Sequence, residues 1–477
     1  MLSYGFAIFM TSDATRMSRS GLAHLLRAAP IRIYKLVMPV LVGAATLAAV
    51  LLIGLSPRRA VSLPLYARQT GQPCATCHTA FWELTPFGRR FKLGGYTLGG
   101  GDWSGPPFAV TLQPGFTHTE VGQPGGAAPH FGQNNNITVQ ATSLYTGGRI
   151  TDNLGAFIQG TYDNVSRRFG WDQADIRYAD KVNVGDHNLL WGVTLNNNPT
   201  VQDVWNTLPA WRFPYIFSGL MPQPAASPFI AGPFAQRVLG LGAYGFLDDL
   251  LYFELSGYRP LSTNTQLVLG VDTTGFSPIV GIAPYWRVAI EPNFGNNSLE
   301  FGTFGLKSSV VPMGMSSAGN DSFTDIGVDA QYQYLGDPHT VTLRAAWIRE
   351  NHRTGASQAL GLADNSHDIL RSLNASLSYI YDKTWSFTAG RFSVGGTADA
   401  ALYGTFTGSP NSAGWITEIA YLPFSYGGPS FWPWLNARIG VQYTFFNKFN
   451  GATTNFNGVG RNAHNNNTLF VYTWIAF

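Results

Sequence analysis

The two cysteines of this chain stand in a single motif, Cys74-Ala75-Thr76-Cys77-His78. The C-x-x-C-H spacing is that of covalent attachment of a c-type haem. Two thiols at this spacing can add to the two vinyl groups on one edge of a haem, and the histidine that follows can reach the iron. We therefore predict one haem c, attached to Cys74 and Cys77, with His78 as the iron ligand. No catalytic residue is expected beyond the haem itself.

Three other roles for the two thiols fit the sequence less well. A structural zinc site takes four ligands, and only one other neighbouring histidine pair could supply the rest. A thioredoxin-like dithiol is expected in a βαβ context, which the flanking sequence does not show. A disulfide that closes a loop of four residues would be an unusual structural link.

The residues after the motif predict a short helix that could support the haem. Thr85-Pro86 is typical of an N-cap followed by proline at the first helical position, and Gly94-Gly95 is typical of a helix end. Phe87 and Phe91 share one face of this helix and could lie on the haem. Three basic residues could pair with the haem propionates or form a solvated basic face: Arg89, Arg90 and Lys92.

The second axial ligand of the iron stays open. No methionine lies in the segment around the motif, and the chain has 7 in all. The candidates are an open or water-ligated position or one of five side chains: His118, His130, Met221, Met313 and Met315.

The composition restricts the kind of protein that holds this motif. The chain has 477 residues, of which 12% are charged and 14% aromatic; soluble domains usually have about 25% charged residues. Many aromatics with few charges exclude intrinsic disorder. A mean hydropathy near zero excludes a bundle of transmembrane helices. A net charge of +3 is too weak to indicate a nucleic-acid partner.

The N-terminal region predicts export. Basic residues precede an uncharged apolar stretch, Leu36 to Leu55, which is the pattern of a secretory signal. We expect residues 1–60 to be a targeting segment, cleaved between Ser56 and Ala67, with Met17 as an alternative start. The stretch is long enough to serve as an uncleaved anchor instead.

From about Thr111 onward the chain alternates polar and apolar residues. Residues 137–145, 154–162, 326–334, 373–381 and 435–445 follow this pattern, which is typical of strands with one apolar face. Gly147-Gly148, Asp248-Asp249 and Asp382-Lys383 are expected turns. Strands of about ten residues can cross a bilayer, and the apolar last strand ending in Phe477 resembles the assembly signal of bacterial outer-membrane barrels.

These patterns predict an all-β fold: a transmembrane outer-membrane β-barrel of about 16 antiparallel strands over residues 111–477. A large soluble β-sandwich accounts less well for the aromatic excess. The longest break in alternation, Pro199 to Gln236, is expected to be a long external loop that can fold inward. Residues 61–110 form the haem segment, and a segment of about 45 residues is too short to build its own core. We therefore expect a partly helical plug inside the barrel.

Around the motif the sequence is similar to a known family. The matching runs are Ala67 to Gly71, Cys74 to His78, Leu84 to Arg89, Phe91-Lys92 and Gly94 to Thr97. They resemble the fused monohaem cytochrome–porins, which include outer-membrane Fe(II) oxidases of iron-oxidising bacteria. The resemblance is specific over about 30 residues around the haem motif, while over the barrel it is one of architecture and length.

The resemblance implies an outer-membrane oxidoreductase that takes electrons from extracellular Fe(II). A periplasmic cytochrome or copper protein would accept the electrons, and outer-membrane lipid would surround the barrel. Two alternatives stay open. The chain could be a conduit for another extracellular donor or acceptor, or a diffusion porin whose haem is structural.

Overall fold

The computed structural model describes residues 64–80, 82–101, 107–273, 277–432 and 435–477. The expected targeting segment, residues 1–60, lies outside these ranges, and so does the alternative start at Met17. Within the described residues, no helix combines the length and apolarity that a membrane-crossing helix needs.

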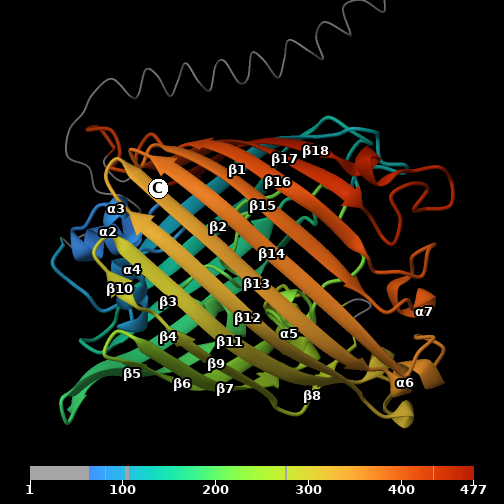
Figure 1. Cartoon of the computed structure of the whole chain (residues 1–477), viewed down its shortest axis with the longest axis horizontal. Helices are drawn as coiled ribbons and strands as arrows, with labels where there is room; N and C mark the ends of the chain where they lie inside the picture. The colour runs from blue at the N-terminus through green and yellow to red at the C-terminus, as the bar shows by residue number, and fades with distance from the viewer. Residues whose placement is uncertain (1–63, 81, 102–106, 274–276, 433–434) are drawn as a thin grey trace, which may run out of the picture. The chain divides into compact units, whose positions relative to one another are not determined.

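The described strands form one antiparallel sheet that closes on itself, because the last strand pairs with the first (Figure 1). The strands are β1 (Phe108–Thr119), β2 (Asn136–Arg149), β3 (Leu154–Asp163), β4 (Arg168–Val184), β5 (His187–Asn196), β6 (Val238–Leu247), β7 (Leu251–Pro260), β8 (Ile279–Val280), β9 (Ala283–Ile290), β10 (Asn293–Phe294), β11 (Asn297–Val310), β12 (Asp321–Leu335), β13 (His339–Arg353), β14 (His367–Tyr381), β15 (Trp385–Gly396), β16 (Ser412–Tyr421), β17 (Asn436–Lys448) and β18 (Thr468–Ala476).

The closed sheet described here is a barrel of 16 strands. The two-residue pieces β8 and β10 lie on either side of β9 in the chain, and all three pair with β11. They therefore make one interrupted strand. The predicted fold class and strand number are therefore confirmed. The five predicted strands lie within β2, β3, β12, β14 and β17, although the last prediction began one residue early.

The two ends of the barrel differ in the length of their connections. One end carries short turns, among them 185–186, 248–250 and 382–384, and also the start of β1 and the end of β18. Asp248, Asp249, Asp382 and Lys383 take positive φ in these turns, as predicted. Gly147-Gly148 is not a turn, because both residues lie inside β2, and the chain reverses at 150–153 instead.

The opposite end carries most of the long connections, although 422–435 lies at the short-turn end, and it carries most of the short helices. These are η1 (Pro199–Gln202), η2 (Phe229–Ala231), α5 (Thr263–Val268), η3 (Pro312–Gly314), η4 (Ser316–Ala318), α6 (Gly355–Ala359), α7 (Ala400–Tyr403) and η5 (Ala463–Asn466). Short turns at one end and long loops at the other are typical of bacterial outer-membrane barrels.

The two faces of the sheet are the reverse of those in a soluble protein. In β13, Arg344 and Glu350 are buried toward the lumen, while Leu343 and Trp347 are exposed on the outer face. Alternate strand residues point to opposite faces, so polar groups face inward and apolar groups face outward. This is the pattern of a barrel that spans a membrane.

The N-terminal segment fills part of the lumen. It contains α2 (Pro64–Thr70), α3 (Cys74–Cys77) and α4 (Pro86–Leu93). Tyr66 bonds to Ala156 on β3, Tyr96 to Asp175 on β4, and Arg89 to Gln331 on β12. These strands lie at separate positions around a closed sheet, so a segment that reaches all of them must lie inside it.

The connection 197–237 also folds into the lumen rather than outward. Residues 197–208 are almost completely buried, and Leu84 and Lys92 of the plug bond to this segment. We call residues 197–237 the inward loop. The expectation of a long loop that can fold inward is met, and the two buried segments meet in the lumen.

Candidate haem-binding site

The haem motif forms a single helical turn whose local sequence accounts for its shape. Pro73 precedes α3 in an extended conformation, and the His78 amide donates to the Cys74 carbonyl over 2.8 Å. This turn carries both thiols. His78 leaves it in an extended conformation and pairs with Leu84 in an antiparallel bridge. The histidine is therefore held directly beside the turn.

Cys74 is buried in an apolar and aromatic group of side chains, the Cys74 cluster. Its buried members are Cys74, Ala80, Ile216, Ile380, Leu422, Phe470, Tyr472, Trp474 and Ala476. Trp82 packs against the cluster, with its ring centroid 5.3 Å from that of Trp474. Asn436 at the start of β17 donates to the Cys74 sulfur over 3.1 Å. The inner face of β18 is thus aromatic where it meets the motif.

The environment of the thiols opposes thiolate chemistry. Cys74 and Cys77 are not joined in a disulfide. Burial, and after it the nearby Cys74, raise the pKa of Cys77 to about 12. Reactive dithiols and thiolate metal sites require a lowered pKa. The surroundings therefore favour cysteines that act as attachment points rather than as redox or zinc-binding groups.

The imidazole of His78 is held in the form that binds iron. Burial lowers its pKa to about 4, against the opposing effect of hydrogen bonds with the backbone of Glu83 and Trp82 and of the Glu83 charge. A metal ligand must be a neutral imidazole. The donor set therefore fits a haem: two adjacent thiols, a neutral histidine next to them, and apolar aromatic side chains around them.

Glu83 anchors the loop that follows His78. Its carboxylate accepts from Arg344 of β13 over 3.1 Å, from Tyr215 over 2.8 Å, from Ser378 of β14 over 2.9 Å and from Thr79 over 2.7 Å. Burial alone would raise the pKa of Glu83, but the Arg344 charge and these hydrogen bonds lower it to about 2. The carboxylate is thus ionised and joins the motif to the barrel wall.

The helix after the motif forms as the sequence predicts. Thr85 caps α4 by accepting from the Gly88 amide over 3.2 Å, Pro86 is its first residue, and Gly94 follows its end. The rings of Phe87 and Phe91, which were predicted to face the haem, have different surroundings. Phe91 packs on Tyr66 and Tyr96, whereas Phe87 is 39% exposed.

The three basic residues of α4 have protein partners. Arg89 is paired with Glu291 over 2.8 Å. Lys92 bonds to the carbonyls of Val201 and Asp203 on the inward loop. The exposed Arg90 lies 3.1 Å from Asp249. Each of these side chains therefore helps to dock the plug onto the rest of the protein. The sequence had instead predicted that they pair with the haem propionates or form a solvated basic face.

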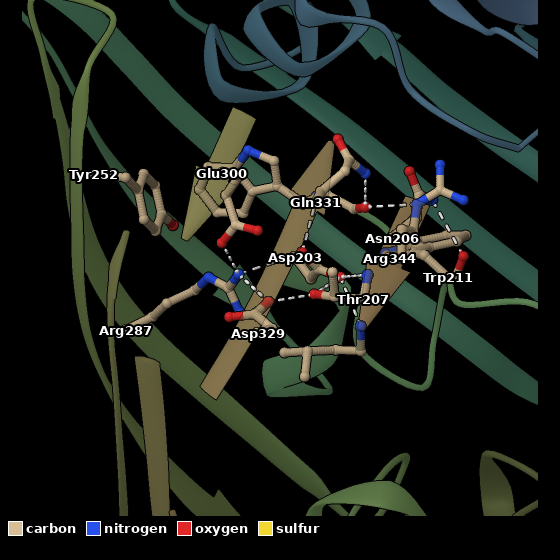
Figure 2. Close-up of polar contacts among 12 residues, drawn as sticks. Asp203, Asn206, Thr207, Trp211, Tyr252, Arg287, Glu300, Asp329, Gln331 and Arg344 are labelled. Atoms are coloured by element: carbon tan, nitrogen blue, oxygen red, sulfur yellow. Dashed lines mark hydrogen bonds and ion pairs between the residues drawn. The ribbon is translucent and has the colours of Figure 1, made fainter. Parts of the chain in front are cut away.

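The inward loop is fixed by a buried ionic group, the Arg287 network, which comprises Arg287, Glu300, Asp329, Asp203 and Thr207 (Figure 2). Arg287 of β9 donates to Asp329 over 2.6 Å and to Glu300 over 3.1 Å. Thr207 bonds to Asp329, and Asp203 accepts from the Thr207 amide. The charges of three strands thereby hold the loop in place.

The next residues of the inward loop reach the plug. Asn206 accepts from the Leu84 amide over 3.0 Å and donates to the Trp82 carbonyl over 3.1 Å. Sequence reasoning missed these loop residues. The available signal was the run Asn196 to Asn198 followed by a segment rich in proline and tryptophan.

A cavity of about 600 Å³ lies between the inward loop and strands β1 to β4. Its wall includes Trp82 of the plug and Trp211, Arg212 and Tyr215 of the inward loop. It reaches residues 165–166, in the short connection between β3 and β4, and residues 270–272, in the long connection after β7, both at the long-loop end. Pockets of this size hold cofactor-sized ligands. Trp82 thus separates the Cys74 cluster from a chamber that extends toward the long loops.

None of the five candidates for the second axial ligand lies beside the motif. His118 is near the far end of β1 and bonds to Asn135 over 2.8 Å, and His130 is in the next connection. Met313 and Met315 are exposed in the connection before β12, and Met221 packs with Phe446 and Phe449. All five lie toward the long-loop end, whereas Cys74 contacts residues of the short-turn end. Within the described residues, no group of three or more His, Cys, Asp and Glu side chains is placed to hold a metal ion.

Comparison with known proteins finds similar solved structures but no similar sequence. No family model and no curated protein matches the sequence. Among solved structures, the outer membrane channel DcaP of Acinetobacter baumannii has a TM-score of 0.46 at 11% identity, covering 78% of this chain and 96% of that one. Salmonella typhi OmpF in complex with daunomycin has 0.44 at 13%, covering 78% and 97%. OmpT of Vibrio cholerae has 0.41 at 8%, covering 78% and 96%. At such identities these neighbours indicate no activity.

Proposed function

We propose that this chain is an outer-membrane c-type cytochrome–porin that oxidises extracellular Fe(II) and passes the electrons inward. One haem c, attached to Cys74 and Cys77 and ligated by His78, would carry them. A periplasmic cytochrome or copper protein would accept them. The observation that carries the proposal is the position of the motif: a C-x-x-C-H turn lies inside a closed transmembrane barrel.

The residues present suit the attachment of this group. Cys74 and Cys77 would hold it through thioether bonds, and His78 would ligate its iron. When bound, a haem supplies reversible one-electron transfer. Asn436, Glu83 and Arg344 hold the motif against the wall, and the Cys74 cluster keeps water away from it. The plug and the inward loop keep this site at a fixed place in the lumen.

Fe(II) is the proposed donor on chemical grounds and on the resemblance around the motif. Its oxidation product, Fe(III), is insoluble near neutral pH, so oxidation outside the cell avoids a precipitate inside. The transfer of one electron needs no nucleophile, general acid or general base. Trp82 and Trp211, whose ring centroids are 6.5 Å apart, line the chamber that extends toward the long loops, where an extracellular donor would arrive.

Mixing the purified ferric protein with Fe(II) in a stopped-flow spectrometer tests the proposal. We expect the haem absorption to change to that of the ferrous form, and we expect His78→Ala to lose this reaction while the barrel still assembles. Sulfide in place of Fe(II) tests the other-donor alternative. A haem that no Fe(II) concentration reduces at any pH at which the protein is folded would contradict the proposal.

A diffusion porin with a structural haem is the second candidate, because the chamber of about 600 Å³ lies in the lumen of a 16-strand barrel. Conductance across a planar bilayer separates the two candidates. A plugged conduit passes little current, whereas a diffusion porin conducts steadily in the presence of the plug.

A further inference from the structure

Arg212 is a cation of the inward loop that lines the chamber and also a smaller neighbouring pocket. It follows Trp211 and lines the same wall as Trp82 and Tyr215. Its backbone amide is bonded to the Leu208 carbonyl over 2.9 Å, so its position on the loop is fixed. Its guanidinium, by contrast, has neither a hydrogen bond nor an ion pair among the residues that the structure describes.

The other charged side chains of this wall have ion-pair or hydrogen-bond partners. Arg168 lies 3.1 Å from Asp272. Asp172 accepts from Gln159 over 2.8 Å and from Thr161 over 3.0 Å, and Asp163 accepts from backbone and hydroxyl groups of the next connection. Arg212 therefore stands apart from its neighbours within the described part of the wall.

An uncompensated guanidinium in this position is unfavourable. Burial lowers the pKa of Arg212 to about 10, which shows that the charged form loses hydration without gaining a counter-charge. A buried charge normally has an ionic partner. A bound anionic ligand would supply the counter-charge that the described residues do not give Arg212.

A second donor faces the same chamber. Gln140 of β2 is 5% exposed and lines the chamber. Its Oε1 accepts from the Gly219 amide over 3.0 Å, whereas its Nε2 has no hydrogen-bond partner in the structure. A guanidinium and an amide NH₂ together are suited to an anionic oxygen ligand.

The chamber is joined to the haem motif through shared residues. Trp82 packs on the Cys74 cluster and also forms part of the chamber wall. Asn206 donates to the carbonyls of both Trp82 and Trp211, and Tyr215 donates to Glu83. These contacts hold the backbone on either side of Arg212 against the loop that follows His78.

We propose that Arg212, with Gln140, binds the propionate carboxylates of the haem attached at Cys74 and Cys77. The inference rests on the proposed function, because it needs the haem to be present. On a haem, the propionates leave the edge opposite the vinyl groups, so anchoring the vinyl edge in the Cys74 cluster directs the carboxylates away from it. Arg89, Arg90 and Lys92 are engaged elsewhere, which leaves Arg212 for this role.

Spectroelectrochemical titration of the haem tests the proposal. In Arg212→Gln the propionate charge is left unbalanced, which favours the ferric form and lowers the reduction potential. We expect about a tenfold change in the redox equilibrium, which for one electron corresponds to about 59 mV. Arg212→Lys should shift the potential by less than half as much, because it keeps the charge.

Arg168→Gln is the matched control, since it removes an arginine from the same wall that already has a carboxylate partner. We expect its potential to stay close to that of the wild type. Circular dichroism and heat-modifiable electrophoresis check that each barrel is assembled. Equal shifts in the Arg212→Gln and Arg168→Gln proteins, or no shift in either, would overturn the assignment.

Labelling of the full-length chain with phenylglyoxal gives a test that needs no variant of Arg212. Mass spectrometry should find Arg212 protected in the haem-containing protein and reactive in the haem-free Cys74→Ala/Cys77→Ala protein. Labelling that is equal in both would overturn the assignment. If Arg212 is labelled in the haem protein and acetate suppresses this labelling, the assignment is also overturned, because Arg212 would then bind a free anion. A wild-type chain that matures without haem c would reject the proposed function and the inference together, whereas a haem protein without these effects rejects only the inference.

Discussion

The Cys74 cluster and the Arg287 network fill two parts of one lumen by opposite means. The cluster uses apolar and aromatic side chains from the plug, the inward loop and several strands. The network uses a cation and three carboxylates, with Arg287 1% exposed (Figure 2). Because the outer face of this barrel is apolar, polar side chains point inward. The lumen is filled either by closely packed apolar side chains or by charged side chains that pair with one another.

The difference between the two regions corresponds to a difference in role. Ionic and hydrogen-bonded contacts are directional, so the Arg287 network determines where the inward loop lies. Apolar contacts are less directional and adapt to the shape of a large flat ligand. The Cys74 cluster is held by adaptable apolar contacts, which suit the proposed haem. The Arg287 network is held by directional ionic contacts.

Removing the attachment cysteines should have the largest effect, and it should be confined to the Cys74 cluster. In Cys74→Ala/Cys77→Ala we expect complete loss of covalent haem and of Fe(II)-dependent reduction, because no thiol remains to form a thioether. The pyridine haemochrome spectrum measures the haem. The barrel should still assemble, since strand pairing from β1 to β18 does not involve the motif. Covalent haem in this variant would contradict the assignment of the motif.

Breaking the Arg287 network should have the next largest effect. Arg287→Met leaves Glu300 and Asp329 without their cation, and removal of one partner from a buried ionic group costs about 3–5 kcal/mol of unfolding free energy. We expect a lower urea midpoint and a higher single-channel conductance, because the inward loop loses its anchor.

An exposed ion pair supplies the control for Arg287→Met. Arg149 and Asp152 are 44% and 83% exposed, so Arg149→Met should cost about 0–1 kcal/mol and leave the conductance unchanged. If the two variants behave alike, the network does not position the loop.

Replacing the carboxylate that ties the loop after His78 to the barrel wall should have a smaller effect. Glu83→Gln keeps a hydrogen-bonding oxygen but leaves Arg344 without its counter-charge, which we expect to cost about 3 kcal/mol. The Soret band should shift because the loop after His78 is held less firmly. Ser378→Ala, which removes one hydrogen bond to the same carboxylate, should cost about 1 kcal/mol. A larger effect of Ser378→Ala would show that charge pairing is not what holds the loop.

Much of the fold followed from local patterns. Alternation of polar and apolar residues identified strands such as β12 and β14, because successive side chains of a strand point to opposite faces. The cap at Thr85 and the stop at Gly94 located α4 for an equally local reason. The turn expected at Gly147-Gly148 was wrong, because two glycines also fit inside a strand, here at positive φ within β2.

From the sequence, only the haem motif of the candidate site could be predicted, and haem attachment there stays a prediction. The motif identified Cys74, Cys77 and His78, since attachment chemistry depends on spacing along the chain. The partners of Arg89 and Lys92 were not predictable, because Glu291 and the carbonyl of Val201 are far away in sequence. The five ligand candidates were chosen without knowledge of which end of the barrel each would occupy.

The sequence by itself therefore determined the barrel, its approximate strand number and the residues that can attach a haem. These features depend on residue type and short-range periodicity, which are properties of the linear chain. Only the tertiary structure decided that the inward loop meets the plug, that Glu83 is tied to Arg344, and that Arg212 lines the chamber with no side-chain partner among the described residues. Such contacts arise when the closed sheet brings distant segments into one lumen, where each buried charge must find a partner.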